Sequence, residues 1–328
     1  MPDADRAILF PLHDDVGIVT DMALEQQLEL VSASVGSPQA GIFGPESMTW
    51  QINREAVIFL AAGRALLLQL AHPWIAQAVA DHSRALSEPI SRFHRTFKTV
   101  FALVFGTVDQ AFSAARNLHR RHSRVIGVLP TTIGPFKAGS PYCANNISAL
   151  RWVYATLIDS ALVAHDLILP QLTAEQRVQH YSESLNFAGM FGIRRTLLPA
   201  DYAGLIAYTE AMCDSHILTV SDSARRLGIQ IFAGGRSWLR VPASYRAITA
   251  GLLPERVRRD FGFSYGDAER RSAERALELI RRTYPLLPAR LRYVAPYHEA
   301  RERVGGKSPP RILTQLLNRL WIGQRYLA

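Results

Sequence analysis

The sequence predicts an all-α protein formed by one large domain, residues 1–328. Apolar residues recur at helical spacing over long stretches, and few segments alternate with a period of two. No internal repeat and no long linker divides the chain. Apolar residues make up 48% of the chain and charged residues 20%, which is typical of globular domains and excludes disordered and collagen-like classes.

Four helices are predicted in the first part of the chain. They cover residues 52–71, 74–86, 93–106 and 111–127. Pro73 and Pro89 lie where the first two end, because proline does not continue a helix. Gly106 closes the third helix, and Asp109 is the expected N-cap of the fourth.

A loop rich in Pro, Gly, Ser and Asn is predicted over residues 129–147. Helices resume after it, over residues 148–168, 173–190, 200–213, 216–227, 241–253 and 266–283. The stretch GIQIF, residues 228–232, is predicted to be a short strand. The tail 310–328 is predicted to be a basic amphipathic helix that docks on the core, on a partner or on a membrane surface.

The charge balance and the cysteine count exclude several classes of protein. The net charge is +9, and nearly all of the positive charge is arginine, which reflects either codon usage or a preference for bidentate anionic partners. No basic stripe is interleaved with aromatic residues, so no nucleic-acid partner is expected. Two cysteines are too few for a disulfide scaffold or a Cys-rich metal centre.

The N-terminal residues and the longest apolar run predict a soluble, cytoplasmic protein. The opening segment lacks the pattern of a secretory leader. The apolar run 56–71 is interrupted by Arg64 and is too short to span a bilayer. Glycine-rich phosphate loops, HExxH, GxSxG and CxxCH are also missing, which excludes the common nucleotide-binding enzymes, zinc proteases and c-type haem proteins.

Histidines are concentrated in one region of the chain. Four of the ten lie there: His82, His94, His119 and His122. His119 and His122 share a helix face because they are three residues apart, and His122 is expected on the apolar side with His119 nearer the boundary. A buried imidazole needs a partner for each ring nitrogen, and a metal ion supplies one. The alternatives are ordinary surface or core histidines, or a non-haem metal site built from all four.

Three polar residues share a face of the preceding helix. Arg92, Arg95 and Thr96 stand at positions i, i+3 and i+4. A buried arginine beside a hydroxyl needs an anion, such as a haem propionate or a reduced oxygen species. The alternative is that the arginine bridges to Glu88 or to a helix C-terminus.

Five blocks of sequence, in order, resemble the MpaB-type oxygenase family, which includes the catalytic domain of bacterial rubber oxygenase (latex-clearing protein). They are residues 43–83, 91–106, 117–127, 150–162 and 286–304. The resemblance therefore covers about residues 40–305 and leaves 306–328 as a separate tail. It implies an all-helical, globin-like core around a pocket for a non-covalent haem b.

The resemblance also implies which residues hold the haem. The axial iron ligand follows an R-x-x-[KR]-T block, which places it at His122 here. Rubber oxygenase has lysine where this chain has Arg95, and a guanidinium stays protonated and does not bind iron. Family members often carry histidine where this chain has Tyr154, so the role of that position is open.

The function implied is that of a haem b-dependent oxygenase, which uses dioxygen on a small apolar, unsaturated or isoprenoid-like substrate. Arg92 would stabilise negative charge or hold a propionate, Thr96 would donate a hydrogen bond, and Asp81 is the candidate carboxylate base, with His82 and His72 as weaker distal candidates. The alternatives are a non-catalytic carrier of haem or of an apolar ligand, a membrane-surface protein that uses residues 310–328, and the non-haem metal enzyme. The electron donor and the substrate are not identified by sequence.

Overall fold

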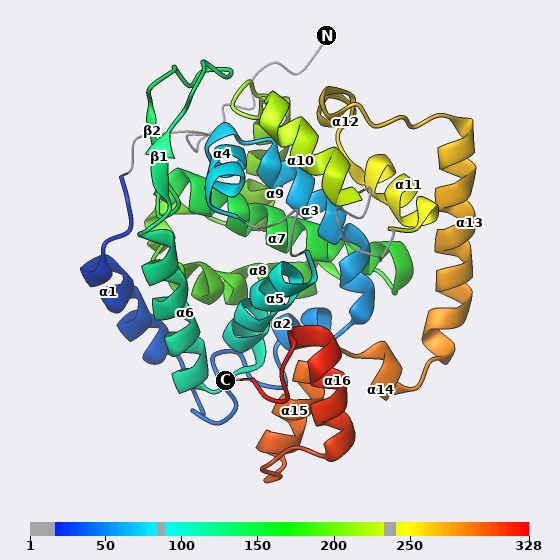
Figure 1. Cartoon of the computed structure of the whole chain (residues 1–328). Coiled ribbons are helices and arrows are strands. Elements are labelled where there is room, and N and C mark those ends of the chain that lie inside the picture. Colours follow the sequence, from blue (N-terminus) through cyan, green and yellow to red (C-terminus); the bar gives the residue numbers. More distant parts are fainter. Residues whose placement is uncertain (1–16, 84–88, 233–240, 328) are drawn as a thin grey trace.

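The computed structural model describes residues 17–83, 89–232 and 241–327. It is 68% helical, with sixteen α-helices and one two-stranded sheet in this part of the chain (Figure 1). The all-α prediction is therefore confirmed.

The elements have the following bounds. The first eight helices are α1 (Asp21–Ser32), α2 (Met48–Asn53), α3 (Ala62–Leu70), α4 (Pro73–His82), α5 (Pro89–Phe105), α6 (Val108–His122), α7 (Ile147–Ile168) and α8 (Ala174–Gly189). The others are α9 (Tyr202–Asp214), α10 (Asp222–Phe232), α11 (Ala243–Leu252), α12 (Glu255–Phe261), α13 (Asp267–Thr283), α14 (Ala289–Arg292), α15 (Ala295–Val304) and α16 (Ile312–Ile322). The 3₁₀ helices are η1 (Ala56–Ala61), η2 (Arg195–Leu197) and η3 (Tyr284–Leu286), and the antiparallel strands are β1 (Ile126–Val128) and β2 (Pro141–Cys143).

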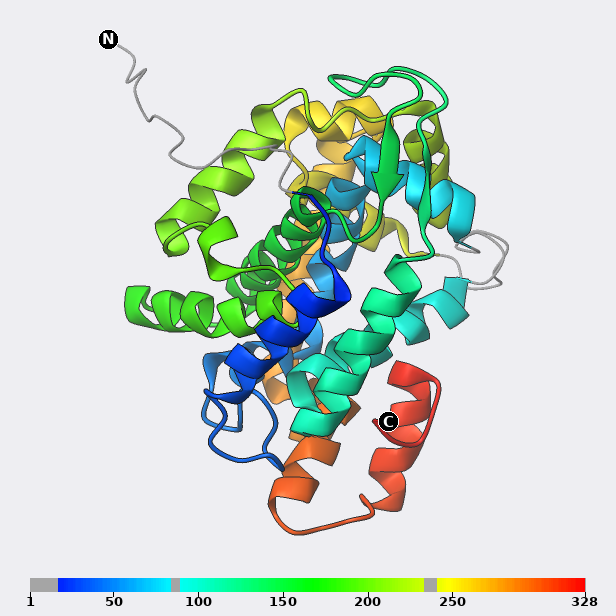
Figure 2. The same cartoon turned by 90° about the vertical axis from the view of Figure 1, so that its left-hand side faces the viewer.

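Helix α7 runs through the centre of the molecule, and other helices surround it (Figures 1 and 2). It begins where the Asn146 side chain accepts a hydrogen bond from the amide of Ala149, and it is buried on most of its circumference. By length and composition α7 could cross a membrane, as could the bent pair of η1–α3 and α4 taken together. Because 78% of the apolar window of α7 is buried inside the fold, α7 forms the core of the described structure.

The run predicted as one helix over 52–71 is divided into the end of α2, then η1, then α3. The division falls at Glu55, whose buried carboxylate accepts two hydrogen bonds from Arg292. Arg64, which interrupts the apolar run, is also buried and forms an ion pair of 2.6 Å with Asp159 of α7. Both charges are therefore paired within the protein.

Three local predictions are wrong. The helix predicted over 111–127 ends at His122, and β1 and β2 pair where the end of that helix and part of the loop 129–147 were predicted. Residues 228–232 form the last part of α10 and not a strand, because a short apolar run fits either structure and here Phe232 packs into the core as part of a helix. The N-cap of α6 is Thr107 and not Asp109, because Thr107 and Gln110 form a reciprocal capping box. Asp109 lies in the first turn instead, where a carboxylate stabilises the helix dipole.

Helices α5 and α6 form an antiparallel hairpin with a turn at Gly106. Arg92 and His122 stand nearly the same number of residues from this turn, on opposite arms of the hairpin. The hairpin therefore brings the start of α5 and the end of α6 to the same end of the molecule. The end of α4 lies there too, because His82 contacts Ile126 directly after α6.

Candidate functional site

The candidate site lies at the open end of the α5–α6 hairpin. The Nη2 atom of Arg121 donates to Oγ1 of Thr99 over 3.2 Å, which fixes the last turn of α6 against α5. Arg92 donates through Nη1 to the hydroxyl of Ser83, which directly follows α4. These contacts join α5 to the last turn of α6, which ends at His122, and to the residue that follows α4.

Arginines give this end of the hairpin a strong positive charge. Arg92 is half-buried, and its pKa is lowered by burial and by the nearby charge of Arg95. The pKa of Arg121 is lowered by partial burial and by Arg95 as well. No carboxylate of the described residues lies within ion-pair distance of Arg92 or Arg121. Glu88, the alternative partner predicted from the sequence, lies outside the described residues. Clustered guanidinium groups of this kind favour an anionic ligand.

The imidazole of His122 is neutral at physiological pH. Burial lowers its pKa to about 4, and the charges of Arg121 and His119 lower it in the same direction. A neutral imidazole has a lone pair on one ring nitrogen, which is the form that binds metal ions. His122 is partly buried at the last position of α6, so its ring stands where the helix gives way to the β1 segment.

His119 is more buried than the sequence predicts. Its side chain is 8% exposed, and Nε2 lies 3.0 Å from Oδ1 of Asp21 on α1. The prediction that His119 is nearer the boundary than His122 is wrong, because α6 packs against α1 as well as against α5 and so has two buried sides. The Nδ1 atom of His119 is buried without a hydrogen-bond partner among the described residues.

The four-histidine metal site is not formed. His82 pairs through Nε2 with the carbonyl of Ile126 at 3.0 Å, and His94 pairs with the carbonyl of Leu320 at 3.0 Å. His119 faces α1 instead. Across residues 17–83, 89–232 and 241–327, no three His, Cys, Asp or Glu side chains are grouped as metal ligands.

Asp81 lies next to the site, at the end of α4, and two donors hold its carboxylate. Oδ1 accepts from Nε2 of Gln77 at 2.8 Å, and Oδ2 accepts from the hydroxyl of Tyr142 at 2.6 Å. Burial and the Asp81 charge both raise the pKa of Tyr142. The Tyr142 ring packs so closely on Gly127 that a Cβ atom there would overlap its hydroxyl. These contacts join the β1–β2 sheet to α4.

The remaining sequence candidates have other surroundings. Thr96 is exposed on α5. Tyr154 is buried in α7, and its hydroxyl shares a 2.6 Å hydrogen bond with Ser184 of α8. His72 is buried before α4, with its ring 5.3 Å from that of Phe136. Of the predicted site residues, Arg92, Arg95 and His122 therefore lie on the hairpin near its open end, and His82 and Asp81 are joined to the segment after α6 through Ile126 and Tyr142.

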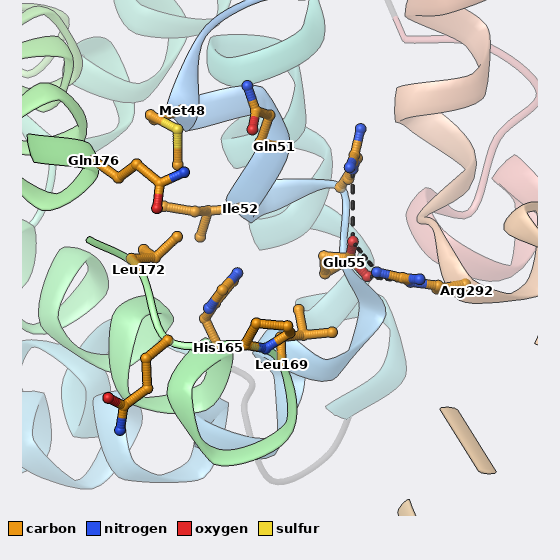
Figure 3. A pocket seen from close by; sticks show the side chains of 12 residues that line it. Met48, Gln51, Ile52, Glu55, His165, Leu169, Leu172, Gln176 and Arg292 are labelled. Carbon is orange, nitrogen blue, oxygen red and sulfur yellow. Dashed lines mark hydrogen bonds and ion pairs between the residues drawn. The ribbon is translucent and has the colours of Figure 1, made fainter. Parts of the chain in front are cut away.

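A separate cavity of about 340 Å³ lies between α2, the C-terminal end of α7 and α14 (Figure 3). The Glu55–Arg292 pair forms one wall, and His165 points into the cavity from α7. Burial lowers the pKa of His165, although Asp166 opposes this shift. The local sequence pattern does not predict this cavity, because only the fold brings Glu55 and Arg292 together. The volume of the cavity lies at the lower end of the range for small-ligand sites.

The comparison with known families identifies the class of protein. Residues 49–282 match the family model described as "ER-bound oxygenase mpaB/B'/Rubber oxygenase, catalytic domain". This match covers more than half of the chain, so the chain belongs to that family, and its class is that of the oxygenases, which are oxidoreductases. Neither a curated protein nor a solved structure matches the chain. The matched region contains the whole α5–α6 hairpin, whereas the resemblance of 286–304 lies outside it and stays a prediction.

Proposed function

We propose that this protein is a haem b-dependent oxygenase that uses dioxygen on a small apolar, unsaturated substrate, with His122 as the iron ligand. One observation carries the proposal: a neutral imidazole stands beside clustered guanidinium groups at the end of one helical hairpin. The family to which the chain belongs supports the oxygenase class.

The residues present fit a haem. His122 has a pKa of about 4 and therefore offers a free lone pair to iron at pH 7. The pKa values of Arg92 and Arg121 are lowered mainly by burial and further by the nearby charge of Arg95, and anionic propionate groups would stabilise these partly buried charges. When bound, haem supplies an iron centre that activates dioxygen.

The side chains of the site have distinct roles in this proposal. His122 holds the cofactor, and Arg92 stabilises negative charge that develops beside it. Arg95 contributes charge but no ligand, because a guanidinium stays protonated. Thr96 offers a hydroxyl from the same helix, and the Oδ2 atom of Asp81 accepts a hydrogen bond from the hydroxyl of Tyr142.

An aromatic wall beside Arg92 supports an apolar substrate. Phe93, Phe97 and Phe101 follow one face of α5, with ring centroids 4.5 and 5.8 Å apart. Phe59 of η1 lies 4.6 Å from Phe97, and Trp321 of α16 lies 4.9 Å from Phe59. Phe93 follows Arg92 in sequence and is rotated from it by about 100° around α5, so the aromatic residues and Arg92 occupy neighbouring faces of this helix.

The absorption spectrum of protein purified with ample haem tests the cofactor. We expect a Soret band that shifts on reduction and with carbon monoxide. His122→Ala is expected to lose the band while remaining folded, and His216→Ala, which removes an exposed histidine from a different segment, is the matched control. Full haem content and the parent spectrum in His122→Ala would refute the ligand assignment.

Oxygen consumption separates the enzyme from a non-catalytic carrier. We expect the loaded protein to consume dioxygen with at least one of a panel of terpenoids, carotenoids and unsaturated lipids. Arg92→Ala is expected to keep its haem and to turn over at least tenfold more slowly, since removal of one charge-stabilising donor costs about 10²–10³-fold in well-studied sites. Haem binding without oxygen consumption across the panel would favour the carrier.

A further inference from the structure

Helix α16 buries two polar side chains beside Trp321 and Ile322, and it exposes a row of apolar side chains. Thr314 and Asn318 face the protein and are buried. The hydroxyl of Thr314 donates to Glu302 at 3.0 Å, and the amide of Asn318 donates to Glu299 at 2.6 Å. A surface helix ordinarily shows the reverse arrangement.

The outward face of α16 carries an apolar stripe, made of Ile312, Leu313, Leu316 and Leu320. At about 100° of rotation per residue, these positions fall within an arc of about 100°. Ile312 is 76% exposed and Leu320 is 69% exposed. A contiguous apolar patch on a surface marks an interaction site.

Contacts with the rest of the protein prevent α16 from rotating about its axis and burying the stripe. Trp321 anchors α16 on Phe59, and His94 of α5 pairs with the carbonyl of Leu320. Rotation of the leucines inward would expose Trp321 and remove Asn318 from its buried carboxylate partner. Among the described residues the stripe therefore stays exposed and is accessible to another molecule.

The residues around the stripe are basic and favour an anionic binding partner. Residues 303–328 contain no Asp or Glu. Four exposed basic side chains accompany the stripe: Lys307, Arg311, Arg319 and Arg325. A second copy of this chain would place Arg319 against Arg319 or Arg311 across a two-fold axis, which is repulsive. We propose that α16 docks on the surface of an anionic phospholipid membrane, with the leucines in the interface and the arginines at the headgroups.

A second exposed apolar segment enlarges this surface. Leu286, Leu287 and Leu291 are exposed around η3 and α14, which lie at the same end of the molecule as α16 (Figure 1). Tyr326 is exposed next to α16 and is an amphipathic ring of the kind found at membrane interfaces.

Docking through α16 would place the candidate site close to the lipid. Lys98 of α5 donates to Gln324 at 2.8 Å, and His94 lies between Arg92 and Arg95 on the same helix. An apolar substrate dissolved in the membrane would then be near the aromatic wall of α5. This last link rests on the proposed function, whereas the docking itself does not.

Co-sedimentation with vesicles tests the docking. The full chain is mixed with vesicles of phosphatidylcholine alone and with vesicles that also contain about 30% phosphatidylglycerol. The anionic lipid gives the second set a negative surface charge, which attracts basic segments. We expect at least tenfold stronger binding to the anionic vesicles and a decrease with salt. The variant Ile312→Gln/Leu316→Gln/Leu320→Gln is expected to lose at least tenfold in binding. Val178→Gln, an exposed apolar residue on α8, is the control and should bind as the parent does.

The arginine variant gives an independent readout. Arg311→Gln/Arg319→Gln is expected to weaken anionic binding by about fivefold for each charge removed and to leave binding to neutral vesicles unchanged. Circular dichroism and the thermal midpoint should match the parent, because the altered side chains are exposed. Two results would overturn the proposal: equal sedimentation of parent and triple variant, or a parent dimer that the triple variant converts to a monomer. Vesicle binding uses no haem and no substrate, so its failure is distinct from failure of the proposed oxygenase activity.

Discussion

Arg121 reaches across the hairpin to Thr99, and this 3.2 Å hydrogen bond holds the guanidinium beside the imidazole of the next residue, His122. The same charge is one cause of the low pKa of His122. Burial is the main cause of the low pKa of His122, and a contact between two helices therefore adds a second, electrostatic cause.

Arg121→Gln is expected to raise the pKa of His122 above about 4, because it removes a positive charge next to the ring. Thr99→Val is the matched control, since it removes the hydrogen-bond acceptor and leaves the charge in place. The measurement is an NMR titration of the His122 ring protons in haem-free protein. An unchanged pKa in Arg121→Gln would show that burial alone lowers it.

Variants of Asp81 and Tyr142 distinguish a catalytic role of the Asp81 carboxylate from a structural role. Tyr142→Phe removes the hydroxyl donor and is expected to lower the free energy of unfolding by about 1 kcal/mol. If Asp81 acts as the base, Asp81→Asn slows oxygen consumption by at least tenfold, whereas Tyr142→Phe changes it little. Steady-state oxygen uptake and urea unfolding measure the two effects. Equal losses of turnover in both variants would indicate that Asp81 acts only through the packing of β2.

The fold class was predictable because helical periodicity and the positions of Pro and Gly are local signals. The end of α13 and the extent of α7 follow them closely. The strand predicted at 228–232 was wrong because five residues are too few to show a period, and the burial of Leu227 and Phe232 in the core decided for a helix. The break between α2 and η1 was not predictable, because its cause is Arg292, far along the chain.

The candidate site was predictable only in part. The spacing of Arg92 and Arg95 predicted that both lie on one face of α5. The charge of Arg95 lowers the pKa of Arg92, which agrees with their proximity. The burial of His119 depends on α1, a helix that the sequence analysis did not predict, so the order of burial within α6 was reversed. The Thr99–Arg121 contact depends on the register of the hairpin, which no local pattern contains.

Glu55 is expected to be a major structural residue of the fold. Its two carboxylate oxygens accept from Arg292, each at 2.9 Å, and Oε2 also accepts from the hydroxyl of Tyr284. Glu55→Gln leaves the Arg292 charge without its counter-ion and is expected to cost about 3 kcal/mol, near the lower end of values for a broken buried pair because Arg292 keeps some solvent contact. Urea unfolding measures this loss. Glu278→Gln, which breaks an exposed pair with Arg282, is the control and should change the stability by less than about 1 kcal/mol.

His180 on α8 should make the stability of the protein depend on pH. Its side chain is buried, neither ring nitrogen has a hydrogen-bond partner among the described residues, and burial lowers its pKa to about 4, with the nearby His165 acting in the same direction. In the unfolded chain the pKa is about 6.5. Between these two values the unfolded chain binds a proton that the folded protein does not, so the free energy of unfolding falls as the pH is lowered through this window, by up to about 1.4 kcal/mol per pH unit. Above pH 6.5 both states are neutral and the dependence vanishes.

His180→Leu is therefore expected to flatten the acid side of the stability profile. The variant removes two unpartnered polar atoms, so its stability at pH 7 should equal or exceed that of the parent. Urea unfolding of haem-free protein at several pH values from 4 to 8 measures the slope, and His216→Leu, at an exposed position, is the control that should keep the parent slope. Because burial also lowers the pKa values of His122, His165 and His298, part of the slope should remain in His180→Leu, and it should decrease further when His122 is replaced as well. A slope that is the same in the parent and in His180→Leu would mean that the folded protein protonates His180 as readily as the unfolded chain does.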